Sequence, residues 1–374
     1  MRYRPLEGIR ILDISRLYPG ALATKKLADL GADVVKVEEP GRGDYIRTIP
    51  PLVGGKGVLH MLLDPGKRSV ALNLNRPDDL ATFHRLAWAA DVIVESARPG
   101  RWGEIGVDLA ELRRRRRELV VCSVSGFGQT GPLAPLPSHG MNMDALSGIL
   151  ILADWKGRQR FISLGFSIGV EMGASNAALG IAAAIYGAKT NGEGVWIDAS
   201  CWDGAVETQR MPIAAHVGAG APIGELHDPG ALYDLYETVD GKLVLFCAIE
   251  RKFWESFCGG VARPDLAARW SGADVDFGDT SLREELEKIF VTKTAAEWEK
   301  HFFEWDVPGS AVLRISEVLE HPHTAARALV GGDGKPLVSN PLRWHDLGER
   351  PGDEFTEPPG LGEHTEEVLN EWLG

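Results

Sequence analysis

The sequence predicts an α/β fold built on a parallel sheet. Short runs rich in Val, Ile and Leu alternate with longer segments in which apolar residues recur at helical spacing. The run GIRILDI, the helical segment ended by Gly31, and the run DVVKV form a β-α-β unit, which joins parallel strands. The expected strands are 8–14, 33–37, 68–74 and 91–95, and the expected helices are 21–30, 78–90 and 109–118.

A site is expected around the stretch from Val121 to Asn142. A buried strand at 119–124 leads into a loop at 125–132 with three glycines and one proline, where the backbone must turn sharply or pass close to another group. His139 then precedes apolar residues at helical spacing. A titratable group is thus placed near the carboxyl end of a strand, where ligands usually bind in open α/β sheets. A surface loop with an ordinary helix-capping histidine fits the same residues.

The second half of the chain predicts a smaller α+β domain. An alanine-rich helix at 174–188 and a strand at 195–197 still belong to the first pattern. From about His227 the pattern becomes a hairpin, with strands at 233–238 and 243–248. Amphipathic helices follow at 253–259, 281–290 and 294–304, and a proline-rich acidic tail ends in a helix at 365–373. The expected domains are a large one at 1–220, a small one at 221–325, and a return to the large domain at 326–374.

Composition limits the classes of partner. The formal net charge of −13 argues against duplex nucleic acid or an anionic membrane surface as a partner. The arginine run 113–117 would spread around a helix, so a solvated face is expected there. Four scattered cysteines give no metal or redox motif, and no apolar run looks long enough to span a bilayer. We therefore expect a soluble, cytoplasmic protein without a metal site.

The usual nucleotide-binding and hydrolase signatures are absent. No GxGxxG follows the first strand, and there is no Walker lysine motif, no GxSxG and no HExxH. Six other motifs occur in order and at a fixed spacing from about Pro5 to about Leu329. They are PLEGIRILDISRLYPG, LADLGADVVKVEEPGRGD, KRSVALNLNRPD, DVIVESARPG, SVSGFGQTGP and NGEGVWIDAS.

These motifs resemble family III CoA-transferases, a family that includes formyl-CoA and carnitine CoA-transferases and the α-methylacyl-CoA racemases. The resemblance implies a large Rossmann-like domain formed by both chain ends, with a small domain between them. It also implies an interlocked homodimer whose two chains thread through each other. The substrate would be an acyl-CoA thioester, with coenzyme A as part of the substrate and no prosthetic group.

Two segments resemble the racemase branch. Racemases carry a catalytic histidine in a Gly-His-Asp-Ile-Asn stretch, which corresponds here to residues 138–142 and points to His139. They place a glutamate that bonds this histidine in a segment like 248–253, which points to Glu250. Such a carboxylate would fix the imidazole tautomer and stabilise its protonated form. A surface carboxylate at a strand end is the other interpretation of Glu250.

One position departs from the family pattern. The family's catalytic aspartate corresponds here to Gly169, which can neither attack an acyl-CoA nor carry a proton. Glu171, two residues later, could reach the same space from the first turn of the helix, where the helix dipole favours its charge. Glu171 fits a plain helix N-terminal carboxylate equally well.

Basic residues at strand ends are expected to hold the phosphates and adenine of CoA. Gly126 and Gly128 would lie near the thioester, where loop N–H groups could stabilise an enolate oxygen. Where racemases have a second arginine before the proline of the second-strand turn, this chain has Glu39. The CoA-binding candidates are Arg16, Lys36, Arg42, Asn75, Arg76, Arg98 and Arg101.

Three hypotheses of function follow. The first is epimerisation of a 2-methyl-branched acyl-CoA by α-proton transfer, with His139, Glu250 and Glu171. The second is CoA transfer between carboxylic acids, with Glu171 as a displaced nucleophile. The third is a catalytically silent protein that binds CoA thioesters and has lost the aspartate.

Overall fold

The computed structural model describes residues 3–162, 164–220, 230–270, 280–331, 337–353 and 356–374. The chain forms two compact units, which are described separately. Unit 1 comprises residues 1–210 and 326–374, and unit 2 comprises residues 211–325. The boundaries between the units follow residues 210 and 325, whereas the sequence predicted boundaries after residues 220 and 325.

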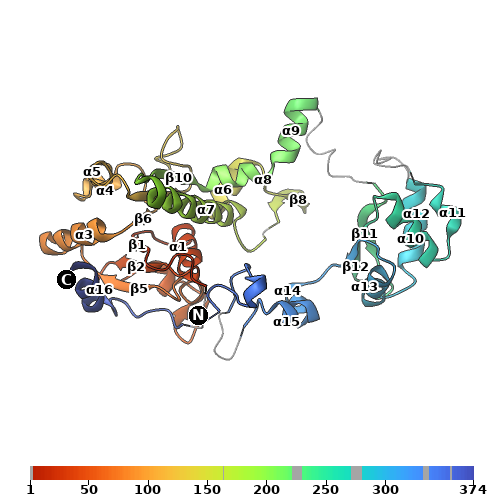
Figure 1. Cartoon of the computed structure of the whole chain (residues 1–374). Coiled ribbons are helices and arrows are strands. Elements are labelled where there is room, and N and C mark those ends of the chain that lie inside the picture. The colour runs from red at the N-terminus through yellow and green to blue at the C-terminus, as the bar shows by residue number, and fades with distance from the viewer. Residues whose placement is uncertain (1–2, 163, 221–229, 271–279, 332–336, 354–355) are drawn as a thin grey trace. The chain divides into compact units, whose positions relative to one another are not determined.

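A six-stranded parallel sheet forms the centre of unit 1 (Figure 1). The strand order is β10-β7-β6-β1-β2-β5, which is 6-5-4-1-2-3 in chain order and therefore the order of the Rossmann fold. The predicted α/β class with a parallel sheet is confirmed. The strands are β1 (Arg10–Asp13), β2 (Asp33–Glu38), β5 (Arg68–Ala71), β6 (Val92–Glu95), β7 (Val120–Ser125) and β10 (Trp196–Ser200).

Helices cover both faces of this sheet because successive strand side chains point to opposite faces. On one face Ile11 and Val34 pack with side chains of α1 (Pro19–Asp29) and α7 (Ile168–Asn191). On the other face Leu12 and Val35 pack with α3, α5 and α16. These three helices span Pro77–Ala89, Leu109–Arg115 and Thr365–Leu373.

The C-terminal helix is anchored to the first strands of the chain. Trp372 of α16 is buried, and its Nε1 donates to Asp33 Oδ2 at 2.8 Å. Arg68 of β5 pairs with Asp33, Glu367 and Glu371. Both chain ends therefore build unit 1.

The expectation that no apolar run is long enough to span a bilayer is wrong for helix α7. Its 24 residues have a mean hydropathy of 1.4 in the most apolar window, so by length and composition it could cross a membrane. Half of that window is buried inside the protein, where Ala174 and Ile181 pack against the sheet. This packing explains the apolar character of the buried half of α7.

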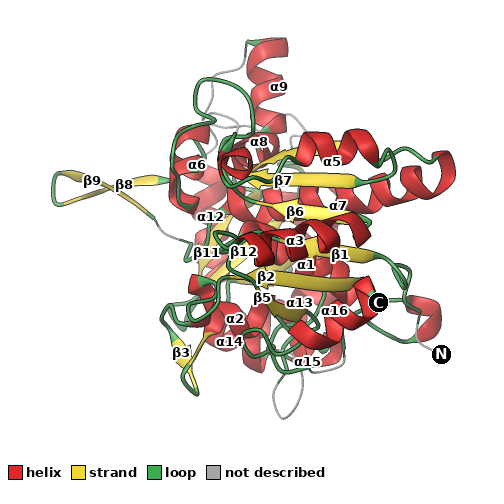
Figure 2. Ribbon diagram, turned by 90° about the vertical axis from the view of Figure 1, so that its left-hand side faces the viewer, coloured by secondary structure: helices red, strands yellow, loops and turns green. Residues whose placement is uncertain are grey.

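A short hairpin in unit 1 was not predicted. Strands β8 (Leu152–Trp155) and β9 (Arg158–Phe161) pair antiparallel and extend away from the sheet (Figure 2). The remaining elements of unit 1 are β3 (Leu52–Val53), β4 (Lys56–Gly57), α2 (Val58–Leu63), α4 (Arg101–Glu104), α6 (Gly140–Ser147) and α8 (Cys201–Thr208), with short 3-10 turns at Tyr45–Arg47 and His345–Leu347.

Unit 2 contains the predicted hairpin and an aromatic core. Strand β12 (Leu243–Cys247) pairs antiparallel with β11 (Tyr233–Glu237) and with β13 (Gly309–Ala311). Phe246 of β12 and Phe290 of α12 pack in that core, with ring centroids 5.3 Å apart. The helices are α10 (Arg251–Gly260), α11 (Pro264–Ala267), α12 (Thr280–Phe290), α13 (Ala295–Glu304), α14 (Ile315–Glu320) and, at the unit boundaries, α9 (Arg210–Ala219) and α15 (Pro322–Arg327).

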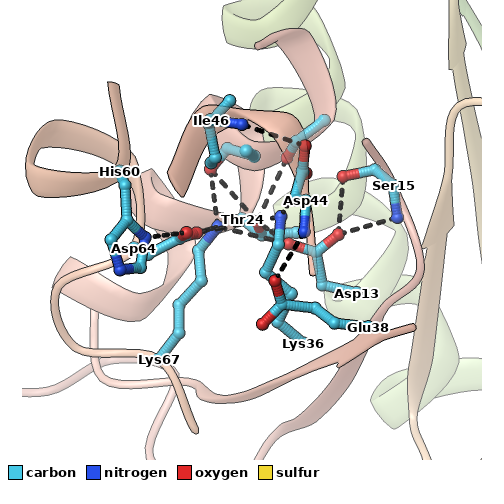
Figure 3. A network of polar contacts seen from close by, with 12 residues as sticks. Asp13, Ser15, Thr24, Lys36, Glu38, Asp44, Ile46, His60, Asp64 and Lys67 are labelled. Carbon is cyan, nitrogen blue, oxygen red and sulfur yellow. Dashed lines mark hydrogen bonds and ion pairs between the residues drawn. The ribbon is translucent and has the colours of Figure 1, made fainter. Parts of the chain in front are cut away.

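Beneath the carboxyl edge of the sheet lies a buried network of charges (Figure 3). The Lys36 ammonium contacts Asp44 at 3.0 Å and Asp64 at 3.8 Å. Lys67 Nζ lies 3.2 Å from both Asp13 and Asp64. Burial alone would raise the pKa of Asp13 and of Asp64, but the two lysines hold both pKa values below the usual range.

This network fixes the loop that follows β1. Asp44 accepts the N–H of Leu17 at 3.0 Å, and Leu17 has a left-handed φ of 62°, which is rare outside glycine. Arg47 donates to Glu38 at 2.8 Å and to the carbonyl of Pro359 at 2.8 Å, so the C-terminal segment is attached to the same network. The β1–α1 loop is therefore held in a conformation that it would not adopt alone.

We predict that Lys36→Met destabilises unit 1 by about 3–5 kcal/mol, because it leaves buried carboxylates without their counter-ion. Lys56→Met is the matched control, since Lys56 and Glu357 form an ion pair whose side chains are 47% and 63% exposed. The control should cost only about 0–1 kcal/mol. Urea unfolding of the two variants and the wild type measures the difference.

The pH dependence of stability is a second test of the Lys36→Met variant. Carboxylates with lowered pKa values stabilise the fold above their unfolded pKa of about 4, and this stabilisation is lost as the pH falls. The increase in stability between about pH 3 and pH 5 should therefore be shallower in Lys36→Met. Equal losses in Lys36→Met and Lys56→Met would contradict a structural role for the network.

Candidate active site at the carboxyl edge of the sheet

A cavity of about 470 Å³ opens at the carboxyl ends of β1, β2, β5 and β6. The strand order reverses between β1 and β6, which is the usual ligand-binding position in such sheets. Arg42 and Arg76 do not line this cavity, although both are exposed. The CoA-binding candidates that line it are Arg16, Lys36, Asn75, Arg98 and Arg101.

Several guanidinium groups at this edge are free to bind an anion. Arg16 and Arg42 lie over the ring of Tyr45, with Cζ 5.0 Å and 5.8 Å from its centroid. The Arg98 guanidinium donates to the carbonyl of Pro135 at 3.3 Å. Within the described residues, none of these three arginines forms an ion pair with a carboxylate. Arg101 differs, because it pairs with Glu104 on the surface.

Lys36 has a different role from the one expected. Its side chain is 1% exposed, and its ammonium group is bound to the carboxylates of Asp44 and Asp64. A lysine held in this way cannot turn toward a phosphate without breaking its ion pair with buried Asp44 and one of the ion pairs of Asp64. We therefore assign Lys36 to the support of the β1–α1 loop.

A second hollow of about 690 Å³ adjoins this cavity and shares Arg98 and Trp102 with it. Its buried carboxylate, Glu95, accepts hydrogen bonds from Trp102 Nε1 at 2.8 Å and from the N–H of Ala97 at 2.6 Å. Burial raises the pKa of Glu95. The sequence did not single out Trp102 or Glu95, because their positions depend on how α4 packs beside β6.

The glycines of the loop after β7 permit close approach of other segments. A Cβ on Gly126 would lie 2.1 Å from Ser138 Oγ, so only glycine lets the segment that carries His139 pack there. Gly128 has a left-handed φ of 82°, and a Cβ there would lie 3.3 Å from Asp198 Oδ2. Neither glycine lines the 470 Å³ cavity. Their contact with a thioester stays a prediction.

His139 stands immediately before helix α6 and is exposed. Its N–H donates to Asn142 Oδ1 at 2.8 Å, and the N–H of Asn142 donates to the His139 carbonyl at 2.8 Å. The predicted helix start is therefore confirmed. The main chain is fixed by this pair of bonds.

Helices α6 and α7 are tied together at their N-terminal ends by Asp144. This carboxylate is 2% exposed and accepts the N–H groups of Ile168 at 3.1 Å and Gly169 at 2.8 Å. Ser167 Oγ lies 3.0 Å from both Asp144 Oδ1 and the carbonyl of Gly140. The residue after His139 is thus in contact with the first turn of α7.

No side chain fits at position 169. A Cβ on Gly169 would lie 2.8 Å from the carbonyl oxygen of Cys201 and 3.0 Å from Asp144 Oδ1. Glu171 lies roughly 200° further around the helix, and its Oε1 accepts the hydroxyl of Tyr18 at 2.6 Å. The expectation that Glu171 reaches the space of residue 169 is therefore wrong, because the two positions face different neighbours.

Tyr18 connects this carboxylate to an apolar cluster. Burial, and then the hydrogen bond to Glu171, raise the pKa of Tyr18 well above its usual value. Tyr18 and Trp202 pack against an apolar cluster that includes Phe127 and Val170. Within the described part of the chain, the buried atoms Ser125 Oγ and Trp202 Nε1 have no hydrogen-bond partner.

Glu250 belongs to unit 2, where it precedes α10 and is exposed. Its carbonyl accepts the N–H groups of Phe253 at 3.0 Å and Trp254 at 3.1 Å. The pairing of its carboxylate with His139 stays a prediction. Across the described ranges, no group of three or more His, Cys, Asp and Glu side chains could hold a metal ion.

Comparison with known proteins identifies the family. The chain matches CoA-transferase family III over residues 6–365. It is 32% identical over 358 residues to the acetyl-CoA:oxalate CoA-transferase of Acetobacter aceti, an alignment that covers 93% of this chain and 92% of that protein. It is 31% identical over 387 residues to the alpha-methylacyl-CoA racemase of Homo sapiens, with 98% and 93% covered.

Solved structures have the same fold. The crystal structure of Rv3272 from M. tuberculosis has a TM-score of 0.86 at 26% identity and covers 98% of this chain and 99% of that one. A CaiB/BaiF family protein from Brucella suis has a TM-score of 0.82 at 23% identity, with 99% and 100% covered. The family indicated by the six sequence motifs is confirmed, and this chain is an enzyme that belongs to CoA-transferase family III.

Proposed function

We propose that the enzyme epimerises a 2-methyl-branched acyl-CoA by moving its α-proton. The observation that carries this proposal is the pair of helix N-termini that Asp144 holds together. His139 precedes one helix, and Glu171 lies in the first turn of the other. A histidine and a carboxylate on neighbouring helix ends can serve as two acid–base groups for one carbon atom.

The reaction needs no further reactant. One group removes the α-proton, the C–H electron pair moves into the thioester, and an enolate forms. The other group returns a proton to the opposite face of the same carbon. His139 and Glu171 are the two groups in this proposal, and Glu250 supports the imidazole if its carboxylate reaches it.

The enolate oxygen needs hydrogen-bond donors. The N–H groups of the 125–131 loop are candidates, as first expected from its glycines. Ser125 Oγ and Trp202 Nε1 add two buried groups that have no partner among the described residues. Buried polar groups are usually satisfied, so a bound thioester is a reasonable partner for them.

CoA enters as part of the substrate, with no prosthetic group. Its phosphates would bind Arg16 and Arg98, which line the cavity with Asn75 and Arg101, and Arg42, which lies outside the cavity over the ring of Tyr45. Arg16, Arg98 and Arg42 form no ion pair with a carboxylate among the described residues. Arg76, exposed before α3, is a more distant candidate. These local positive charges explain how an anion can bind a protein with a net charge of −13.

CoA transfer between carboxylic acids is the alternative, and the relative from Acetobacter aceti favours it by its name and 32% identity. Glu171 would then attack the acyl-CoA and carry the covalent intermediates. A catalytically silent protein that binds CoA thioesters is the third hypothesis. Gly169 supports it, since the position has neither a carboxylate nor room for one.

We also propose a cytoplasmic homodimer with interlocked chains. Leu179 and Tyr186 of α7 are 70% and 73% exposed, and Leu152 and Phe161 of the β8–β9 hairpin are 61% and 51% exposed. Apolar surface on this scale usually marks an interface. The four cysteines are free thiols, which agrees with a reducing compartment.

The dimer should persist at nanomolar concentration, because threaded chains separate only when they unfold. Analytical ultracentrifugation of a dilution series measures this directly. Leu179→Glu with Tyr186→Glu should reduce assembly, whereas Phe303→Glu, on the 89% exposed side chain of α13, is the matched control. A wild-type monomer at nanomolar concentration would contradict the interlocked arrangement.

Arg98→Ala should weaken CoA binding by about tenfold, since a hydrogen bond to a charged group contributes about 1.5–3 kcal/mol and this one is partly screened. Arg115→Ala is the control, because Arg115 is exposed and pairs with Glu111 on α5. Isothermal titration with CoA at two salt concentrations measures the affinity of each variant and its dependence on salt. Wild-type affinity that is unchanged by salt would argue against arginine–phosphate contacts.

The wild type should exchange the α-hydrogen of a 2-methylacyl-CoA for deuterium in heavy water. His139→Ala should lower the rate by about 10²–10⁴-fold while CoA binding is retained, because it removes one acid–base group. Glu250→Gln should lower the exchange rate by a smaller factor. His345→Ala, at a side chain that is 99% exposed, is the matched control. Mass spectrometry of the recovered thioester measures the exchange.

Glu171→Gln separates the hypotheses. It should impair exchange from both enantiomers if Glu171 is an acid–base group. A glutamyl-CoA thioester trapped with hydroxylamine, in the absence of any α-exchange, would favour CoA transfer. Binding without either activity would favour the silent relative.

A further inference from the structure

We propose that Tyr18 is a positioning residue that holds the Glu171 carboxylate in one orientation as an acid–base group. This inference rests on the proposed function of Glu171. The Tyr18 hydroxyl donates to Glu171 Oε1 at 2.6 Å, within the range of hydrogen bonds to an ionised oxygen. The two residues are 153 positions apart in the sequence, so only the fold brings them together.

The loop that precedes Tyr18 is fixed by hydrogen bonds, and the Tyr18 ring is fixed by packing. The preceding residue, Leu17, is fixed by Asp44, and the N–H of Arg16 donates to Ser96 Oγ at 2.8 Å. The ring of Tyr18 packs against the apolar cluster that contains Val170, the neighbour of Glu171. A donor on such a fixed loop restricts the Glu171 carboxylate to one orientation.

The hydrogen bond leaves one carboxylate oxygen for chemistry. Burial and the neighbouring carboxylate raise the pKa of Tyr18, so the hydroxyl stays protonated and acts only as a donor. Proton exchange needs one free oxygen, and Glu171 Oε2 has no hydrogen-bond partner among the residues that the structure describes.

The same loop carries a phosphate-binding candidate. Arg16 lines the cavity two residues before Tyr18. An acyl-CoA bound to Arg16 would therefore contact the loop that orients Glu171. The other titratable groups near this end of α7 are His139 before α6, Asp144 on α6 and Cys201 on α8.

Tyr18→Phe removes only the hydroxyl and tests the proposal. We expect kcat for α-hydrogen exchange to fall by about tenfold or more, with KM changed less than about twofold. Tyr3→Phe is the matched control, since Tyr3 is 56% exposed and packs against Trp344.

An activity-independent measurement accompanies the kinetics. In a thermal double-mutant cycle, Tyr18→Phe and Glu171→Gln should each lower Tm, and the double variant should lose less than the sum of the two shifts. Additive shifts, or a wild-type kcat in Tyr18→Phe, would overturn the proposal. If the wild type exchanges no α-hydrogen, the proposed function fails. The thermal cycle then decides whether the two side chains are coupled.

Discussion

The buried carboxylate of Asp144 holds the first turn of α7 against α6, and the candidate site depends on this contact. Two backbone N–H groups at the start of α7 are satisfied by a side chain from another helix. Helix starts leave such groups without partners, so a buried helix end requires a cap of this kind. Together with the bond from Ser167 Oγ to the carbonyl of Gly140, this contact holds the helix starts next to His139 and Glu171 against each other.

The absence of a side chain at residue 169 follows from the same packing. The resemblance to the family leads one to expect an aspartate there, but the carbonyl of Cys201 and the carboxylate of Asp144 fill the space. A second carboxylate beside Asp144 would also be repelled. In this chain the available carboxylate is Glu171, which faces the loop after β1. In the proposed acid–base chemistry, the carboxylate therefore reaches the substrate from the side of the β1–α1 loop and not from position 169.

Sequence reasoning was most successful where a role follows from position along one strand. The apolar runs predicted the parallel sheet, and residues just after strand ends, such as Arg16 and Arg98, do meet at one cavity. Lys36 was misjudged because it lies within β2, where its side chain is buried among carboxylates. Tyr18 and Asp144 were missed because their partners are distant in the sequence, and no local pattern marks such a contact.

A crystal structure with a bound 2-methylacyl-CoA tests the central claim most directly. The account predicts that the phosphates contact Arg16 and Arg98 and that the α-carbon lies within about 3–3.5 Å of a nitrogen of His139 and an oxygen of Glu171, on opposite faces. A thioester whose α-carbon is remote from both side chains would contradict the account. So would a Glu171 carboxylate that has turned away from the bound acyl group.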